Sequence, residues 1–159
     1  DRHYNRQTHG SPQFVPPGRC CVLYASDEDR QAAWVTSWPF EQYTKHEWAG
    51  AWVNTLFRNE GMGRSSDLIL KAVAATRWFH HTKASWNEPI PQKGMITFID
   101  ENEVQSDNPG YCYLCAGFSR VGRTKGGLVA VQLLPADMPE PRPPGNAQLS
   151  MPIMDRAEQ

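Results

Sequence analysis

The sequence predicts an α/β fold built around one strand–helix–strand crossover. Residues 51–57 and 94–100 are apolar, β-branched runs of the length that is typical of strands. Between them, residues 65–81 place apolar side chains at the three- and four-residue spacing of an amphipathic helix. A strand, a helix and a second strand in this order predict a right-handed crossover between two parallel strands.

Two hairpins are expected to flank this crossover. The aromatic and β-branched runs 20–25 and 31–38 are separated by the acidic, turn-like "SDEDR", and together they predict the first hairpin. Residues 119–134 predict the last hairpin, which turns at the "KGG" of 125–127. Residues 108–118 are typical of a short helix that precedes it. The predicted order of elements is therefore β-β, β-α-β, α, β-β, arranged in a mixed sheet.

The chain of 159 residues is expected to form one domain followed by a tail. Residues 1–134 contain all of the predicted strands and helices. Residues 135–159 are rich in proline and hold four acids against two arginines, which is typical of a tail or a strap rather than a core element. The formal net charge of −1 excludes a globally basic nucleic-acid-binding protein but leaves room for local basic patches.

Hydropathy and cysteine spacing argue against a membrane segment and a metal centre. No run approaches the roughly 18 to 20 apolar residues of a membrane-spanning helix, and the chain begins without a Met or a signal-like segment. We therefore expect a soluble, cytoplasmic protein with a trimmed N-terminus. Cys112 and Cys115 have the spacing of half a zinc site, but the vicinal Cys20 and Cys21 are poorly spaced to supply the other half. Reduced thiols and no metal are expected.

The stretch "LFRNEGMGRSSDLI" (56–69) joins a predicted strand to the helix through a glycine-bearing turn. The first backbone N–H groups of a helix have no partners within it and point the same way, which favours an anion. Gly61 and Gly63 allow a sharp turn, and a phosphate approaches backbone amides closely only where no Cβ intervenes. The join predicts either a phosphate-binding turn or a plain strand-to-helix turn that needs glycine for its geometry.

Two motifs in the chain resemble the GNAT acetyltransferase superfamily. The R-x-x-G-x-G of residues 58–63 fits the R/Q-x-x-G-x-G/A motif that cradles the pyrophosphate of acetyl-coenzyme A in that family. The Y-x-x-x-G-F of residues 113–118, preceded by Asn108, is similar to a segment of the helix after the fifth GNAT strand. Two features depart from the family: Asn108 lies closer to Tyr113 than is usual, and the first strand and helix are missing or reduced to "DRHYNRQTHG".

The resemblance implies a mixed, centrally splayed sheet flanked by helices, with acetyl-CoA or a related acyl-CoA bound where two strands part. The pyrophosphate would lie at the glycine turn. The residues that the resemblance assigns to cofactor binding are Phe57, Arg58, Gly61, Met62, Gly63, Arg64, Ser65 and Asn108.

For catalysis the resemblance points to Tyr113, at the place where a phenol protonates the departing thiolate as a general acid. Asp100 ends its predicted strand at the edge of the sheet where a base or a substrate anchor would lie. Both residues have plainer alternatives. Tyr113 could be a core tyrosine under the last hairpin, and Asp100 could be a turn acid that leads into "ENEV".

The acceptor is expected to be an amine that is already neutral. Residues 51–57 contain no acid, whereas many GNAT enzymes that act on alkylamines carry a carboxylate on this strand to deprotonate an ammonium. An exocyclic amine of adenine or cytosine is neutral at pH 7 and needs orientation more than a strong base. Trp34 and Trp38 could stack on such a base, or they could belong to the core.

Two basic segments could contact the phosphates of DNA, although solvated surface charge is the alternative. These candidates, with one aromatic among them, are Arg2, His3, Tyr4, Arg6, Arg120, Arg123 and Lys125. Together with the glycine turn and "NPGYCYLCAGF", the two segments resemble phage-encoded GNAT-like proteins related to the Mom DNA-modification protein. Proteins of that type alter the exocyclic amine of adenine in DNA.

We therefore expect a Mom-like GNAT transferase that modifies a nucleobase in DNA, in the host cytoplasm if the chain is phage-encoded. One alternative is an acetyl-CoA-dependent N-acetyltransferase of a small amine or a protein. Another is a non-catalytic GNAT-like binding module. The group transferred, the target base, the involvement of a metal and the oligomeric state stay open, with a homodimer as one option.

Overall fold

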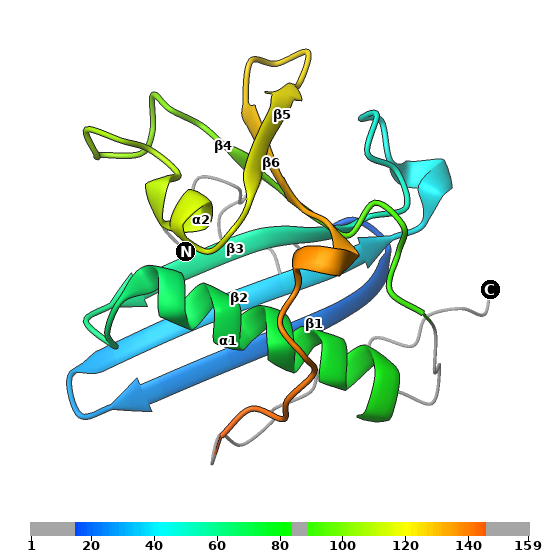
Figure 1. Ribbon diagram of the computed structural model, residues 1–159. Coiled ribbons are helices and arrows are strands. Elements are labelled where there is room, and N and C mark those ends of the chain that lie inside the picture. The colour runs from blue at the N-terminus through cyan, green and yellow to red at the C-terminus, as the bar shows by residue number, and fades with distance from the viewer. Residues whose placement is uncertain (1–14, 84–88, 146–159) are drawn as a thin grey trace.

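The computed structural model describes residues 15–83 and 89–145 and contains a six-stranded mixed sheet (Figure 1). The strands lie in the order β1-β2-β3-β4-β6-β5, and every neighbouring pair is antiparallel except the parallel pair β3–β4. The bounds of the six strands are β1 Gly18–Asp27, β2 Arg30–Pro39, β3 Trp52–Glu60, β4 Met95–Ile99, β5 Ser119–Arg123 and β6 Val129–Leu133.

The helices follow the predicted order. Helix α1 spans Ser65–Trp78 between β3 and β4, and its last turn widens into the π-helical segment η2 at Phe79–Lys83. Helix α2 spans Tyr111–Cys115 before the last hairpin. The described residues also contain two short 3-10 segments, η1 at Glu41–Tyr43 and η3 at Pro135–Asp137. The α/β prediction and the order of elements are confirmed.

One boundary differs from the sequence prediction in a way that shapes the site. Strand β3 does not end at Phe57, because its ladder with β2 continues through Ala33↔Arg58 to Ala32↔Asn59. Arg58 and Asn59 are therefore strand residues, and the turn into α1 is shorter than predicted. The cause is the long hairpin β1–β2, which extends beyond both predicted runs and offers β3 a partner strand along most of its length.

The sheet divides where β3 meets β4. Their parallel ladder contains only Trp52↔Met95, Val53↔Ile96 and Asn54↔Thr97. Beyond the last pair, within the described strands, β3 continues against β2 alone and β4 against β6 alone. A register shift between Val35 and Thr36 of β2 falls at the same level. Figure 1 shows β4, β6 and β5 turning steeply away from the plane of β1–β3. We call the opening between β3 and β4 the fork.

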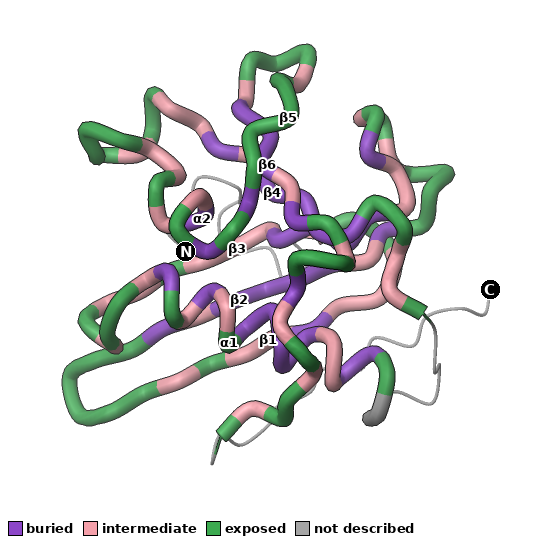
Figure 2. The backbone as a smooth tube through the Cα atoms, in the orientation of Figure 1, coloured by how far each residue is buried: buried purple, intermediate pink, exposed green. Residues whose placement is uncertain are grey.

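The core lies on the face of the sheet that α1 and α2 cover (Figure 2). Ile69 and Val73 of α1 pack with Trp52 and Met95 of the sheet, and Tyr113 of α2 joins the same cluster. A smaller cluster on the other face places the loop after β2 against the central strands. Its buried members are Trp48, Ala51, Val53, Ile96 and Ala130.

Part of the proline-rich segment behaves as a strap. The Arg77 guanidinium donates to the carbonyl oxygens of Met138 and Pro139, and the Arg142 amide donates to the Ala74 carbonyl at 3.1 Å. The Met138 side chain is buried against the core. Residues 135–145 therefore pass over α1 and are held there. Residues 146–159 lie outside the described residues.

Across 15–83 and 89–145, no helix has both the length and the apolar character needed to cross a membrane.

Candidate functional site

The turn between β3 and α1 is organised by one side chain, Asn59. Its Nδ2 donates to the Gly63 carbonyl at 2.7 Å and to Ser65 Oγ at 3.0 Å, while its Oδ1 accepts from the Met62 amide at 2.9 Å. An Asn side chain that bonds a neighbouring backbone is a frequent way to stabilise a tight turn. The sequence analysis did not single out Asn59, although an Asn just before a glycine-bearing turn is a recognisable signal.

The N-terminus of α1 opens beside this turn. Arg64 occupies the N-cap position without a side-chain cap, and its carbonyl accepts from the Asp67 and Leu68 amides at 3.1 Å. Gly63 has a φ of 123°, and a Cβ built there would meet no atom within 4 Å. The space in front of Gly63 is therefore open to a ligand. The first backbone N–H groups of α1 point out of this end of the helix, which favours an anion.

Arg58, one of the predicted pyrophosphate ligands, already has a partner. Its Nε donates to Glu60 Oε1 at 2.6 Å, and Glu60 also accepts from the Gln31 amide. The Gln31 and Arg58 hydrogen bonds hold the pKa of Glu60 below its usual value, with Gln31 the larger cause. Because Glu60 offsets its charge, Arg58 is a weaker anion ligand than the motif alone indicates.

The fork contains a buried polar cluster centred on Tyr113. Its hydroxyl donates to Asn54 Oδ1 at 2.5 Å, and Asn54 Nδ2 donates to the carbonyl oxygens of Val35 and Leu56, both at 2.9 Å. Thr97 Oγ1 donates to the Asn54 carbonyl at 2.9 Å. The exposed fractions of Asn54, Thr97 and Tyr113 are only 2%, 4% and 8%. All three side chains are neutral and lie where β3 and β4 part.

The hydrogen bonds of this cluster fix the direction of the Tyr113 proton. Both Nδ2 hydrogens of Asn54 are used by backbone carbonyls, so its Oδ1 faces the phenol and can only accept. Tyr113 must therefore donate to Asn54. Its ring packs edge-on against Phe57 and Phe118, with centroids 6.2 and 5.3 Å away.

Helix α2 is brought close to β4 by a glycine. Gly110, the N-cap of α2, has a φ of 81°, and a Cβ there would lie 2.3 Å from Ile99 Cδ1. The positive φ favours glycine, and the absence of a Cβ leaves room for the Ile99 side chain where α2 begins. Asn108 is exposed, and its carbonyl accepts from the Tyr111 amide at 3.1 Å, so it belongs to the turn that starts α2.

Asp100 has the contacts of a turn acid. Its Oδ1 accepts from the Asn102 amide at 3.0 Å, and its carbonyl accepts from the Glu103 and Val104 amides. This arrangement corresponds to the plainer of the two sequence interpretations. The carboxylate closes the turn after β4 and is not among the groups that line the Tyr113 cluster.

Trp34 and Trp38 lie between the sheet and α1, as the core interpretation expects. The Trp34 ring is only 2% exposed, and its Nε1 donates to Thr36 Oγ1 at 2.6 Å. Trp38 packs edge-on against Trp52 and against His80, and its Nε1 donates to the Gly50 carbonyl at 3.0 Å. Trp34 is therefore packed against α1, and the half-buried Trp38 ring is held between Trp52 and His80.

The basic hairpin is partly neutralised by an acid from another segment. Arg123 Nη2 lies 2.8 Å from Glu101 Oε2, and Arg120 Nη1 lies 3.4 Å from Glu101 Oε1. These arginines hold the pKa of Glu101 below its usual value, Arg123 being the larger cause. The sequence analysis found no acid within 119–125, and it missed Glu101 because that residue follows a different strand. Lys125 is exposed at the hairpin turn.

Some predicted site residues lie outside the described residues. This is true of every candidate in the N-terminal basic segment, namely Arg2, His3, Tyr4 and Arg6. The structure packs Phe57 against Tyr113 beside the fork, and it leaves the space at Gly63 open before the start of α1. It adds Asn54, Asn59 and Glu101, which the sequence analysis had not selected.

Comparisons of the chain with protein-family models, curated proteins and solved structures find no match.

Proposed function

We propose that the chain is a GNAT-like transferase that binds an acyl-CoA and modifies a neutral exocyclic amine of a nucleobase in DNA. The observation that supports the proposal is the fork, where the β3–β4 ladder ends at Asn54 beside Tyr113, on the strand that continues toward the turn at Gly63. Beyond Asn54, the side of β3 that faces the fork has no partner among the described strands. Past Leu56, whose carbonyl already accepts from Asn54, this edge could pair with an extended ligand that carries amides of its own.

The open glycine turn suits the phosphate end of such a ligand. The amides at the start of α1 and the vacant space at Gly63 would hold the pyrophosphate, with Met62, Arg64 and Ser65 beside it. The amide-containing arm would then run along β3 past Phe57 toward Tyr113. A bound acyl-CoA would supply an activated thioester at the end of this arm.

Among the described residues of the fork, Tyr113 is the group best placed to hold a proton near the reacting atoms. In forming the new bond, the amine nitrogen joins the acyl carbon, the carbon–sulfur bond breaks, the nitrogen loses one proton and the sulfur gains one. If the phenol gives its proton to the sulfur, the hydrogen bond to Asn54 must break first, and the phenolate then takes up the proton that the nitrogen loses. An unsatisfied buried Asn54 oxygen would cost about 1–3 kcal/mol, so Asn54 restrains this role until the ligand is in place.

The neutral character of the fork favours a neutral acceptor. Asn54, Thr97 and Tyr113 are uncharged, and Asp100 is engaged in its own turn. An alkylammonium would need a base to lose its proton, whereas the exocyclic amine of a nucleobase would need only to be positioned. A base in duplex DNA would have to leave the helix stack to reach this cluster, at a cost of a few kcal/mol.

The first test measures binding of coenzyme A by calorimetry. Gly63→Asp places a side chain and a negative charge in the open space before α1 and is expected to abolish binding. Gly126→Asp adds the same charge at the β5–β6 turn, where a new Cβ would have only Thr124 Oγ1 near it, at 3.8 Å, and is expected to bind as the wild type does. A wild-type protein that fails to bind coenzyme A would remove the proposal.

The second test identifies the acceptor. DNA from cells that express the wild type is digested, and the masses of its nucleosides are measured by mass spectrometry. DNA from cells that express the Gly63→Asp variant is the control. A nucleoside of altered mass in the wild-type sample alone is expected. If the nucleosides are identical while coenzyme A still binds, the acceptor is a small amine or a protein instead.

The third test measures whether the β5–β6 hairpin contacts DNA. Glu101→Gln frees Arg120 and Arg123 from their ion pairs, so DNA affinity is expected to rise and its dependence on salt to steepen. Glu140→Gln, an exposed carboxylate on the strap, makes the same change of charge and is the control. Equal effects of the two substitutions would place DNA binding elsewhere.

A further inference from the structure

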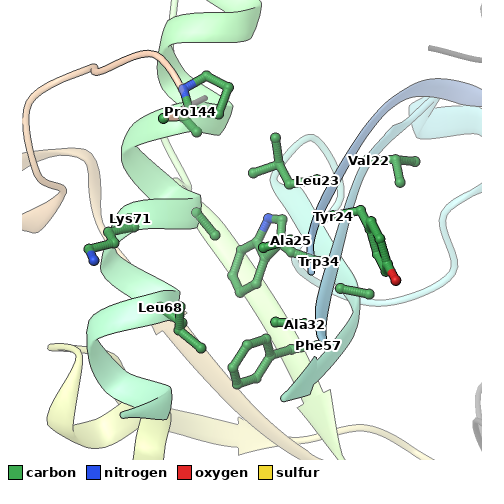
Figure 3. A pocket seen from close by; sticks show the side chains of 14 residues that line it. Val22, Leu23, Tyr24, Ala25, Ala32, Trp34, Phe57, Leu68, Lys71 and Pro144 are labelled. Carbon is green, nitrogen blue, oxygen red and sulfur yellow. The ribbon is translucent and has the colours of Figure 1, made fainter. Parts of the chain in front are cut away.

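An apolar cavity of about 170 Å³ lies between α1 and the β1–β2 hairpin (Figure 3). Leu23 of β1, Trp34 of β2 and Leu68 of α1 form its principal walls, and Phe57 of β3 closes one side. Pro144 and Gly145 of the strap lie at the other end. Figure 3 shows the side chains of Leu23, Trp34, Phe57 and Leu68 directed into the space between helix and hairpin.

The cavity is hollow because small side chains meet across it. Ala25 of β1 pairs with Ala32 of β2, and Ala72 and Ala75 face them from α1. Protein interiors normally fill such contacts to the density of organic crystals. Alanines on three separate elements instead leave room for a guest of several carbon atoms.

One polar group at the cavity, the Lys71 amine, is available to bind a ligand. Lys71 of α1 lines the cavity with its stem, and its amine points away from the Trp34 and Phe57 rings (Figure 3). Lys71 is exposed and has no ion-pair partner among the residues that the structure describes. Its amine can therefore rotate over the rim without breaking a salt bridge, while the stem stays against apolar surface. The Tyr24 hydroxyl, in contrast, already donates to Gln31 at 2.9 Å.

The volume of the cavity and Lys71, the one cationic side chain among its described lining residues, together define the chemistry of a ligand. An enclosed apolar cavity of about 150 Å³ binds benzene, so a pocket of this volume has room for roughly six carbon atoms. Ligand sites of this type combine apolar walls with a few polar groups that fix orientation. The Lys71 amine points outward and would have to swing over the rim, where it would select an anionic head group that remains in water.

We propose that this cavity is a binding site for a small amphiphilic carboxylate, with an apolar body of about six carbons inside and its carboxylate paired with Lys71. This site is distinct from the fork. Phe57 separates the two, because its ring contacts Trp34 on the cavity side and Tyr113 on the fork side, with centroid distances of 5.9 and 6.2 Å. The proposal therefore does not depend on acyl-CoA binding or on transferase activity.

The test uses the full chain and three probes of equal length: hexanoate, hexan-1-ol and hexylamine. The Trp34 indole proton, which donates to Thr36 beside the cavity, reports occupancy by NMR. Saturable binding is expected with hexanoate tightest, about two- to fivefold tighter than the alcohol, because an exposed ion pair contributes that much. Hexylamine is expected to bind weakest. A Trp34 signal that hexanoate leaves unchanged overturns the proposal.

Variants separate the apolar body from the charged head. Ala25→Leu fills the cavity from β1 and is expected to lower hexanoate affinity at least tenfold, whereas Ala136→Leu on the exposed η3 segment should have no effect. Lys71→Gln should remove the preference for hexanoate over the alcohol, and Lys71→Arg should restore it. Circular dichroism verifies that each variant is folded.

Two results would contradict the assignment. If Lys71→Gln and the wild type bind hexanoate equally well, the head-group claim fails. If Ala25→Leu leaves hexanoate binding intact but converts a dimer to a monomer in sedimentation, the cavity is a contact between two copies of the chain and not a ligand site.

Discussion

A single buried amide, Asn54, connects three parts of the molecule. Its side chain bonds β2 through the Val35 carbonyl, its own strand through the Leu56 carbonyl, and α2 through Tyr113. Each bond is of ordinary strength, about 0.5–1.5 kcal/mol net, but leaving one of these buried groups without a partner costs more. The cluster therefore holds α2 over the fork and also sets the orientation of the phenol.

Tyr113→Phe should lower the free energy of unfolding by about 1–3 kcal/mol, because it leaves the Asn54 oxygen buried without a donor. Tyr43→Phe is the matched control, since the Tyr43 side chain is 52% exposed and its substitution should change stability by less than about 0.5 kcal/mol. Urea denaturation measures both. Equal midpoints for the two variants would mean that the phenol contributes nothing to holding α2.

The four thiols should differ widely in reactivity. Burial raises the pKa of Cys20 to about 11 and, with the neighbouring Cys20, that of Cys21 to about 12, whereas Cys115 is exposed on α2. The thiolate is the reactive form, so iodoacetamide near neutral pH should modify Cys115 first and the two strand cysteines only after unfolding. Peptide mass mapping over time gives the order. Early modification of Cys21 in the native protein would show that β1 opens readily.

Among the elements, those with a strong local pattern were predictable from the sequence. The apolar spacing of α1 and the turn residues of both hairpins placed these elements within a few residues of their observed bounds. The end of β3 was placed too early, because the residues 58–60 are polar and only the pairing with β2 keeps them in the strand.

The candidate site was only partly predictable, because its defining contacts join residues that are far apart in the chain. Asn54 and Tyr113 are 59 positions apart, and Glu101 and Arg123 are 22 apart. No local pattern signals either pair. A polar residue inside the apolar run "AWVNTLF" was the one available hint for Asn54, since a buried Asn needs hydrogen-bond partners.

The turn after β4 and the β5–β6 hairpin are joined by Glu101, and this link should depend on pH. Arg123 and then Arg120 hold the Glu101 pKa below its usual value of 4.5. A carboxylate with a lowered pKa in the folded state stabilises the fold above its unfolded value, and that contribution is lost as the pH falls through the folded pKa.

Glu101→Gln should therefore reduce the loss of stability that the wild type suffers as the pH falls below 4.5. The free energy of unfolding in urea, measured on both sides of that pH, reports the difference. Glu140→Gln, whose carboxylate has no ion pair among the described residues, should follow the wild type. Parallel curves for Glu101→Gln and the wild type would show that the ion pairs do not persist in solution.

At the scale of the whole molecule, the sheet consists of two halves that meet at one short ladder. The strands β1–β3 form one half and β4, β6 and β5 the other, joined by three residue pairs between β3 and β4. Helix α1 and the strap lie on one side of the two halves. Met138 of the strap packs in the core, and Arg77 of α1 donates to the strap carbonyls of Met138 and Pro139. The fork is therefore the place where a ligand that touches both halves would add most to their association.

A ligand of that kind should stabilise the entire fold, and this gives a test at the scale of the molecule. Coenzyme A at 100 times its dissociation constant would contribute about 2.7 kcal/mol, provided that it binds only the folded chain. For a chain of this size the midpoint of thermal unfolding should rise by about 5–10 °C, since each kcal/mol corresponds to roughly 2–4 °C. The Gly126→Asp control should show the same rise, and Gly63→Asp should show none.

Hydrogen exchange should slow at β3 residues 55–60 and at the start of α1, and should be unchanged in β1. If Gly63→Asp is stabilised as much as the wild type, the phosphates bind away from the glycine turn. If exchange slows in β1 instead, the ligand occupies the cavity beside Trp34 and the fork is not its site.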